Sequence, residues 1–138
     1  MNGILLIVGT DDFDQTVFIK LFSGKHRLVF VDDFDTVDQA FENVIPDVII
    51  YEMKEIDKSL LKQAEAIRKQ NGHSIPLILI ANENTLEFEK AVRECGVSYY
   101  LLKPYYFREL NEAIESCIKM SKRLKVKNGI HEGGINAE

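Results

Sequence analysis

The chain has 138 residues, of which 46% are hydrophobic and 28% are charged, an ordinary balance for one globular domain with its own core. Its formal net charge of -5 argues against nucleic acid as the main ligand. No apolar run reaches the roughly 18–20 residues of a membrane helix. The apolar start, Met1 to Val8, is too short for a signal peptide. We therefore expect a cytoplasmic domain without a membrane span.

Five short apolar runs recur along the chain and are rich in β-branched residues. Because they are apolar on both faces, they predict strands of a parallel sheet that is covered on both sides. In chain order the runs are Ile4–Val8, Leu28–Val31, Val48–Tyr51, Leu77–Ile80 and Tyr99–Leu102.

Each run is followed by a stretch with apolar residues at helical spacing, which predicts an amphipathic helix. In chain order the apolar stripes are Val17, Phe18, Leu21 and Phe22; Val37, Ala40, Phe41 and Val44; Leu60, Leu61, Ala64 and Ile67; Leu86, Ala91, Val92 and Cys95; and Leu110, Ala113, Ile114, Cys117 and Ile118. Gly96 stands where the fourth helix should stop. Both cysteines lie on apolar stripes and form no metal pattern with the three histidines, so we interpret them as small core residues in a reducing compartment.

The order is therefore strand then helix, five times over. Right-handed crossovers make this an α/β, doubly wound (βα)5 domain, for which we predict the flavodoxin-like strand order 2-1-3-4-5. We place the domain at residues 1–122, followed by a basic and then Gly-rich polar tail or linker at 123–138. Ligands of such folds bind beyond the carboxyl ends of the strands. The residues there are Gly9, Thr10, Asp32, Asp33, Glu52, Ala81, Asn82 and Lys103.

Three segments resemble the third, fourth and fifth strands of receiver domains of response regulators, the phosphorelay proteins of two-component systems. They are Pro46 to Glu52, Pro76 to Asn82, and Gly96 to Pro104 with its Lys-Pro ending. The resemblance covers about residues 3–120. It implies five functional positions: two acids after the first strand that hold Mg²⁺, an Asp that accepts the phosphoryl group, a Thr or Ser, and a Lys that binds phosphoryl oxygens. The metal is needed because a carboxylate does not readily approach an anionic phosphoryl group unless a cation neutralises the charge.

This chain departs from the pattern at four of those positions. The acid pair falls on Gly9 and Thr10, the Thr or Ser falls on Ala81, and the acceptor Asp is Glu52. A Glu carries its carboxylate on the order of 1.5 Å further out, which spoils in-line geometry. Lys103 alone matches the pattern. We therefore expect a degenerate pseudo-receiver that binds no Mg²⁺ or other cofactor and acts without phosphorylation.

The alternative is a working phosphoacceptor. A register shifted by two residues would bring Asp11 and Asp12 to the acid positions, with Mg²⁺ beside Glu52. The first helical stripe favours the unshifted register, because it then falls where the first helix of the family packs. An enzyme on the same fold is disfavoured, since the sequence has no Gly-rich phosphate loop and no nucleophile–base pair.

Several residues allow two interpretations. Glu52 is either a built-in mimic of the phosphorylated state, pairing directly with Lys103, or a solvated carboxylate at a strand end. Tyr100 resembles the switch aromatic of the family, and is otherwise a partly buried aromatic on an edge strand. The acids around Asp11 and Asp32 could hold a cation, but more often serve as caps and turn formers.

The expected contact surface is the face of the fourth helix, fifth strand and fifth helix, which the family uses. Tyr99, Tyr105 and Tyr106 supply aromatic side chains there, and aromatics are favoured at interface hot spots. The sequence thus predicts a protein partner or a homodimer through this face.

Overall fold

The computed structural model describes residues 2–33, 36–37, 39–40, 44–54, 57–68 and 75–127, without the side chains of 12, 13, 68 and 123–127. Within that part of the chain, five parallel strands form one sheet in the order β2-β1-β3-β4-β5, as predicted. The strands are β1 (Ile4–Val8), β2 (Arg27–Val31), β3 (Val48–Met53), β4 (Leu77–Ala81) and β5 (Tyr99–Leu102).

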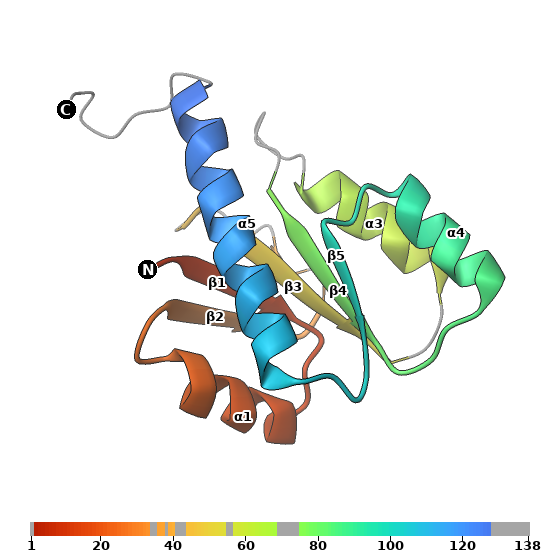
Figure 1. The fold of residues 1–138 in the computed structure, drawn as a ribbon, viewed down its shortest axis with the longest axis horizontal. Coiled ribbons are helices and arrows are strands. Elements are labelled where there is room, and N and C mark those ends of the chain that lie inside the picture. Colours follow the sequence, from red (N-terminus) through yellow and green to blue (C-terminus); the bar gives the residue numbers. More distant parts are fainter. Residues whose placement is uncertain are drawn as a thin grey trace.

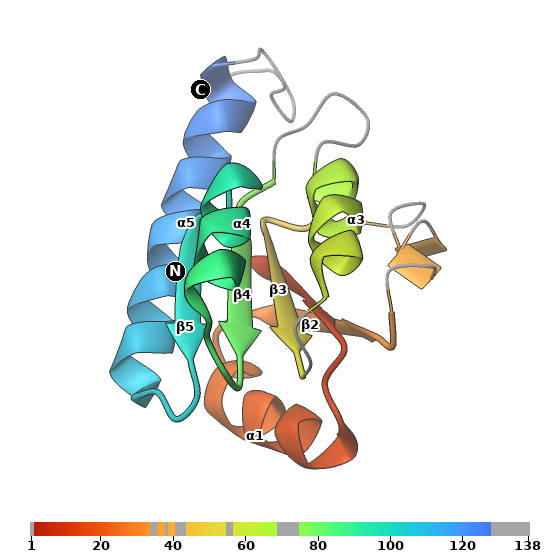
Figure 2. The same ribbon diagram turned by 90° about the vertical axis from the view of Figure 1, so that its right-hand side faces the viewer.

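Helices cover both faces of this sheet (Figures 1 and 2). The helices α1 (Asp12–Phe22) and α5 (Phe107–Lys127) pack on one face, and α3 (Lys58–Arg68) and α4 (Leu86–Glu94) pack on the other. Part of the predicted second helix, including Phe41, lies outside the described residues. Among the helices described, none combines the length and the apolar character that crossing a bilayer requires.

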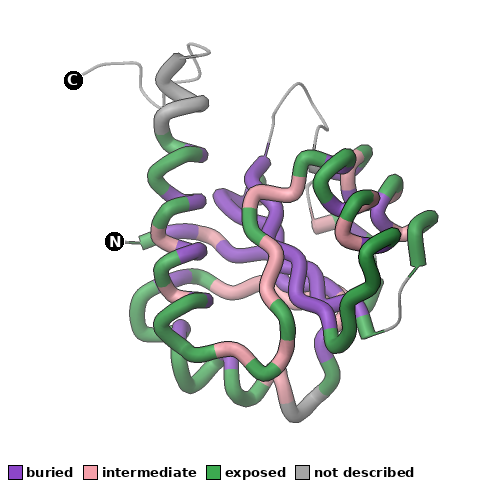
Figure 3. The backbone as a smooth tube through the Cα atoms, turned by 45° about the vertical axis from the view of Figure 1, so that its right-hand side comes forward, coloured by how far each residue is buried: buried purple, intermediate pink, exposed green. Residues whose placement is uncertain are grey.

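The strands β3 and β4 are buried along their whole length, so the core lies on both sides of the sheet (Figure 3). One core cluster joins these strands to α3 and α4, and the other joins them to α1 and α5. The predicted stripe of α5 is confirmed, since Leu110, Ala113, Ile114, Cys117 and Ile118 are all buried. The helix α5 continues past residue 122 to Lys127, and residues 128–138 lie outside the description.

The predicted stripe of α1 was half wrong. Phe18 and Phe22 are buried, but Val17 and Leu21 are exposed, although all four share one helical face. The buried half is narrow because Phe22 stacks on Phe107 of α5, with ring centroids 5.5 Å apart. This aromatic contact sets the rotation of α1 on the sheet and turns the Val17 side outward.

The predicted stripe of α4 was also wrong at its start. Leu86 is 84% exposed, and Phe88 is fully buried in its place. Thr85 is the N-cap, and its side chain accepts a hydrogen bond of 3.0 Å from the Phe88 N–H, which starts the helix at Leu86. The cap places Leu86 on the outer side of the first turn. Gly96, with φ of 72°, follows the helix end as predicted.

Candidate functional site

The residues that the resemblance singles out gather at one edge of the sheet, because the carboxyl ends of parallel strands meet there. Gly9 and Thr10 follow β1, and Lys103 follows β5. Glu52 and Ala81, expected just beyond their strands, lie inside them, since β3 extends to Met53 and β4 to Ala81. Glu52 is therefore part of a central strand, where it pairs with Ile80 of β4.

Glu52 and Lys103 form a direct ion pair, which confirms the contact predicted between them. Glu52 is only 3% exposed, so it is not the solvated side chain of the alternative interpretation. Burial raises the pKa of Glu52, the ammonium of Lys103 opposes this, and the nearby carboxylate of Asp14 raises it further. Burial alone would lower the pKa of Lys103, but its contacts with Glu52 and Asp14 outweigh burial and raise it.

Two further charged residues complete the site: Asp14, one of the acids near Asp11 that the sequence suggested could hold a cation, and Lys54, which the sequence did not single out. Asp14 in α1 places Oδ2 3.1 Å from Lys103 Nζ, and Lys54 after β3 places Nζ 2.9 Å from Asp11 Oδ2 and 4.0 Å from Asp14 Oδ2. Two spacings in the sequence could have indicated these contacts. Lys54 lies two residues after Glu52, on the same side of an extended chain. Asp14 lies three residues after Asp11, at the spacing of neighbouring side chains on a helix.

Both carboxylate oxygens of Asp11 have partners in the structure. Its Oδ1 accepts a 2.8 Å hydrogen bond from the Asp14 N–H and so caps α1, while Oδ2 binds Lys54. The bond from the Asp14 N–H, followed by the contact with Lys54, lowers the pKa of Asp11. Asp12, the other acid of the shifted register, begins α1, and its side chain lies outside the described part of the chain.

The acid-pair positions offer no carboxylate, and the backbone at Gly9 opposes one. Gly9 has a φ of 83°, a left-handed conformation that favours glycine. A Cβ there would lie 3.0 Å from the carbonyl oxygen of Glu52. Thr10 is buried, and its hydroxyl oxygen has no hydrogen-bond partner among the described residues.

The Mg²⁺ that the family implies does not fit these residues. Hard divalent cations need carboxylates free to coordinate, and here ammonium groups contact the carboxylates of Asp11, Asp14 and Glu52. No cluster of three or more His, Cys, Asp or Glu side chains suited to a metal occurs in the described part of the chain.

The switch positions are also altered. Ala81, at the position of the Thr or Ser that the resemblance implies, is buried and has no hydroxyl group whose movement could be coupled to Tyr100. The Tyr100 hydroxyl instead donates a 2.8 Å hydrogen bond to Asn84 Oδ1, and its ring packs edge-on against Phe88 at 6.1 Å. Asn84 in turn donates to Glu89 at 3.4 Å. Tyr100 is thus tied to the start of α4.

The three tyrosines proposed for the contact surface differ in exposure. Tyr106 is 80% exposed and Tyr99 is exposed, but Tyr105 is partly buried and packs against the α5 side of the core. The sequence interpretation missed two exposed leucines nearby, Leu86 at the start of α4 and Leu102 at the end of β5.

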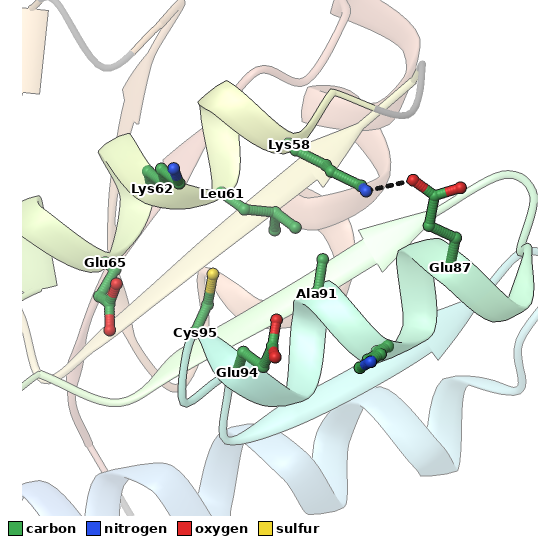
Figure 4. Close-up of a pocket in the computed structure, with 9 residues that line it drawn as sticks. Lys58, Leu61, Lys62, Glu65, Glu87, Ala91, Glu94 and Cys95 are labelled. Atoms are coloured by element: carbon green, nitrogen blue, oxygen red, sulfur yellow. Dashed lines mark hydrogen bonds and ion pairs between the residues drawn. The ribbon is translucent and has the colours of Figure 1, made fainter.

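A separate groove of about 410 Å³ lies between α3 and α4 (Figure 4). Its floor includes Leu61, Ala91 and Cys95, and an ion pair between Lys58 and Glu87 spans it. Burial raises the pKa of the Cys95 thiol, which is the opposite of what activates a nucleophilic cysteine.

No family model matches the chain. Over 115 residues it is 26% identical to the transcriptional regulatory protein CiaR of Streptococcus pneumoniae, a match that covers 77% of the chain and 50% of CiaR. The chain thus spans about half the length of this curated relative.

Solved structures agree on the fold. The signal receiver domain of an HD domain-containing protein from Pseudomonas fluorescens superposes with a TM-score of 0.72, at 23% identity, over 89% of this chain and 99% of that one. The receiver domain of a LuxO-type repressor from Vibrio parahaemolyticus gives 0.74 at 16% identity, over 94% and 99%. NtrX of Brucella abortus gives 0.75 at 18% identity, over 99% and 31%. This chain therefore has the fold of signal receiver domains, and its sequence is similar to that of a transcriptional regulatory protein over most of its length.

Proposed function

We propose that this receiver domain signals without being phosphorylated and acts through protein contacts. The observation that carries the proposal is the direct ion pair of Glu52 with Lys103. In a phosphorylatable receiver the lysine would meet a transferred phosphoryl group, whereas here it already meets a fixed carboxylate. The site is therefore held in one charge state.

The surrounding residues support the same conclusion. Phosphoryl transfer needs an accessible carboxylate in line with the donor and a cation that neutralises charge. Glu52 is buried, and Gly9 and Ala81 supply neither a metal ligand nor a hydroxyl. The structure thus favours a signalling module whose state does not depend on a phosphoryl donor.

The experiment is incubation with acetyl phosphate and Mg²⁺ followed by intact-mass measurement. We expect no gain of a phosphoryl group. A stable gain that is lost in Glu52→Gln would instead support the working phosphoacceptor. A gain that is lost in Asp11→Asn would support its shifted register.

We further propose that the face of α4, β5 and α5 is the contact surface, with Tyr99, Leu102 and Tyr106 as its exposed apolar side chains. A lasting homodimer through this face should bury on the order of 1,200 Å² in total. If the contact has two-fold symmetry, each substitution acts twice. The other form of the proposal is a monomer that presents this face to a different protein.

Sedimentation equilibrium at micromolar concentration separates the two forms. If the protein dimerises, Tyr99→Ala should weaken the dimer. Ile19→Ala should not, because Ile19 is an exposed apolar residue on α1, which packs beside the opposite edge strand β2. A dimer weakened by Ile19→Ala and insensitive to Tyr99→Ala would show that the face is wrong.

The mimic interpretation of Glu52 has its own test. Glu52→Gln keeps the shape of the side chain but removes the charge that Lys103 meets. If the fixed charge holds the domain in its signalling state, this variant should change the dimerisation constant or partner affinity. An unchanged association would leave Glu52 as a structural ion pair only.

A further inference from the structure

The start of β1 is held by a histidine side chain at the amino edge of the sheet, opposite the edge that carries Glu52. The Gly3 N–H donates a 3.1 Å hydrogen bond to His26 Nδ1, and the contact is buried. The Gly3 carbonyl oxygen accepts a 2.9 Å hydrogen bond from the Arg27 N–H. The chain at the start of β2 therefore holds both backbone polar groups of Gly3.

The hydrogen bond from Gly3 determines the protonation state of His26. An imidazole nitrogen accepts a hydrogen bond only when it carries no proton, so the ring is neutral and its proton lies on Nε2. His26 is 5% exposed, and Nε2 has no hydrogen-bond partner among the described residues. The ring of Phe22 lies beside it, with centroids 6.4 Å apart. These surroundings suit a neutral imidazole and disfavour a charged one.

The charges around His26 act in both directions. Burial lowers its pKa below the ordinary value of 6.5, and the N-terminal amino group and Lys25 lower it further. Glu115 of α5 and Asp47, which precedes β3, oppose this shift. Arg27 adds another positive charge, since it lines a surface hollow of about 600 Å³ together with Lys25, His26 and Asp47. His26 is therefore neutral at neutral pH and gains a second ring proton only on acidification.

Asp47 holds the next residue of the same segment. Its Oδ2 accepts a 2.9 Å hydrogen bond from the Ile4 N–H, and its Oδ1 accepts one of 3.5 Å from the Ser121 hydroxyl of α5. Two side chains thus hold successive backbone N–H groups at the start of β1. Of these two side-chain types, only imidazole has an ordinary pKa close to neutral pH.

We propose that His26 is an acid-sensitive tether for the start of β1. A proton that Nδ1 takes from solvent occupies the lone pair that accepts the Gly3 N–H, so the hydrogen bond breaks and leaves two donors facing each other. Gly3 packs against Ile118 of α5, because a Cβ at Gly3 would lie 2.7 Å from Ile118 Cδ1. Release of Gly3 therefore loosens a contact between the start of β1 and α5. The inference goes beyond the proposed function, because it adds a response to acidity at the edge of the sheet remote from Glu52.

The effect on stability has a defined sign. The pKa of His26 is lower in the folded protein than in the unfolded chain, so the unfolded chain binds the proton more tightly. The stabilisation by neutral His26 is fully present above pH 6.5 and is lost as the pH falls through the pKa of His26 in the folded protein. The pH dependence that Glu52 contributes has the opposite sign, so the test compares proteins that differ only at position 26.

The test uses the full chain from about pH 8 to about pH 5, the range in which histidine ordinarily titrates. The ring ¹⁵N chemical shifts of His26 report which nitrogen carries a proton. The protection factor of the Gly3 amide in hydrogen exchange reports its hydrogen bond. His26→Asn places near the position of Nδ1 a carbonyl oxygen that takes up no proton in this range. His26→Gln is the matched control, because its oxygen lies one methylene further out, near the position of Nε2.

We expect wild-type His26 to carry its proton on Nε2 alone at about pH 8 and to gain a proton on Nδ1 below pH 6.5. The protection factor of the Gly3 amide should fall by about tenfold as this happens, which corresponds to about 1.4 kcal/mol for one lost hydrogen bond. In His26→Asn the protection factor should stay constant across the pH range, and in His26→Gln it should be low throughout. Circular dichroism checks that both variants fold.

Four results would each overturn the proposal. The first two are a wild-type ring that carries its proton on Nδ1 at about pH 8, and one that stays neutral down to about pH 5. The third is a Gly3 protection factor that does not change when the ring gains its second proton. The fourth is a folded His26→Asn protein with the same pH dependence as the wild type. The first three need only the wild type, so the proposal can fail even if a variant does not fold. None of the four involves a phosphoryl donor or a partner protein, so failure here is distinct from failure of the proposed function.

Discussion

Gly9→Ala tests whether the backbone itself excludes a side chain at the first acid position. Gly9 has a φ of 83°, and its N–H donates a 3.1 Å hydrogen bond to the carbonyl oxygen of Val31, which holds the conformation in place. A left-handed conformation costs an L-residue about 1–2 kcal/mol. The new Cβ would also lie 3.0 Å from the carbonyl oxygen of Glu52, a backbone atom that cannot rotate away. Alanine also lowers the conformational entropy of the unfolded chain, which stabilises the folded protein by about 0.4–1 kcal/mol and offsets part of this loss.

The conformational terms alone leave a loss of up to about 1.6 kcal/mol, and the close contact with the Glu52 carbonyl brings the expected loss in the free energy of unfolding to about 2 kcal/mol. Urea denaturation measures it, with the slope of the transition checked for constancy. The matched control is Gly24→Ala, because Gly24 is not left-handed and a Cβ there meets nothing within 4 Å. It should be neutral or stabilising by up to about 1 kcal/mol. If Gly9→Ala is as stable as Gly24→Ala, the argument that the backbone excludes a side chain is wrong.

Three further substitutions test the site and the core. Burial raises the pKa of Glu52 in the folded protein above its ordinary value of 4.5, so the folded state binds this proton more tightly than the unfolded state does. The resulting stabilisation is fully present below pH 4.5 and is lost as the pH rises through the pKa of Glu52 in the folded protein. The unfolding free energy of the wild type, measured against Glu52→Gln, should therefore fall as the pH rises above 4.5, and a rise would contradict the assignment. Phe88→Ala should cost about 3–5 kcal/mol in urea denaturation because Phe88 is fully buried, and a loss below about 1 kcal/mol would mean that α4 repacks. Asp47→Ala should lower the free energy of unfolding by about 1–3 kcal/mol, because the Asp47 carboxylate accepts a 2.9 Å hydrogen bond from the Ile4 N–H. Hydrogen exchange of the Ile4 amide should become faster, and unchanged exchange there would refute the role of this bond.

The sequence was sufficient for the fold because the information there is local and repeated. The run Leu77 to Ile80 is apolar on both faces, and only a strand covered from both sides can bury it. The stripe of α5 is equally informative, since five apolar residues at helical spacing leave one possible buried face. The Lys-Pro ending of the segment that starts at Gly96 identified Lys103 as the residue that follows the fifth strand.

The helix rotations were less predictable. Val17 and Phe18 are adjacent and both apolar, so periodicity alone allowed either to define the buried face. The contact of Phe22 with Phe107, 85 positions apart in the numbering, decided between them. At the start of α4, the cap at Thr85 rather than apolar character determined that Phe88 is buried and Leu86 is exposed.

The sequence by itself predicted the parallel sheet and its strand order, and in the unshifted register it placed Gly9, Thr10, Glu52 and Ala81 at the positions that the resemblance singles out. Only the tertiary structure decided how the remaining charges are neutralised. Asp14 and Lys54 come from segments 40 positions apart in the numbering, and their meeting depends on where α1 and the end of β3 lie in space. The physical reason is that strand and helix periodicity is encoded within a few residues, whereas the partner of a charge is set by three-dimensional packing.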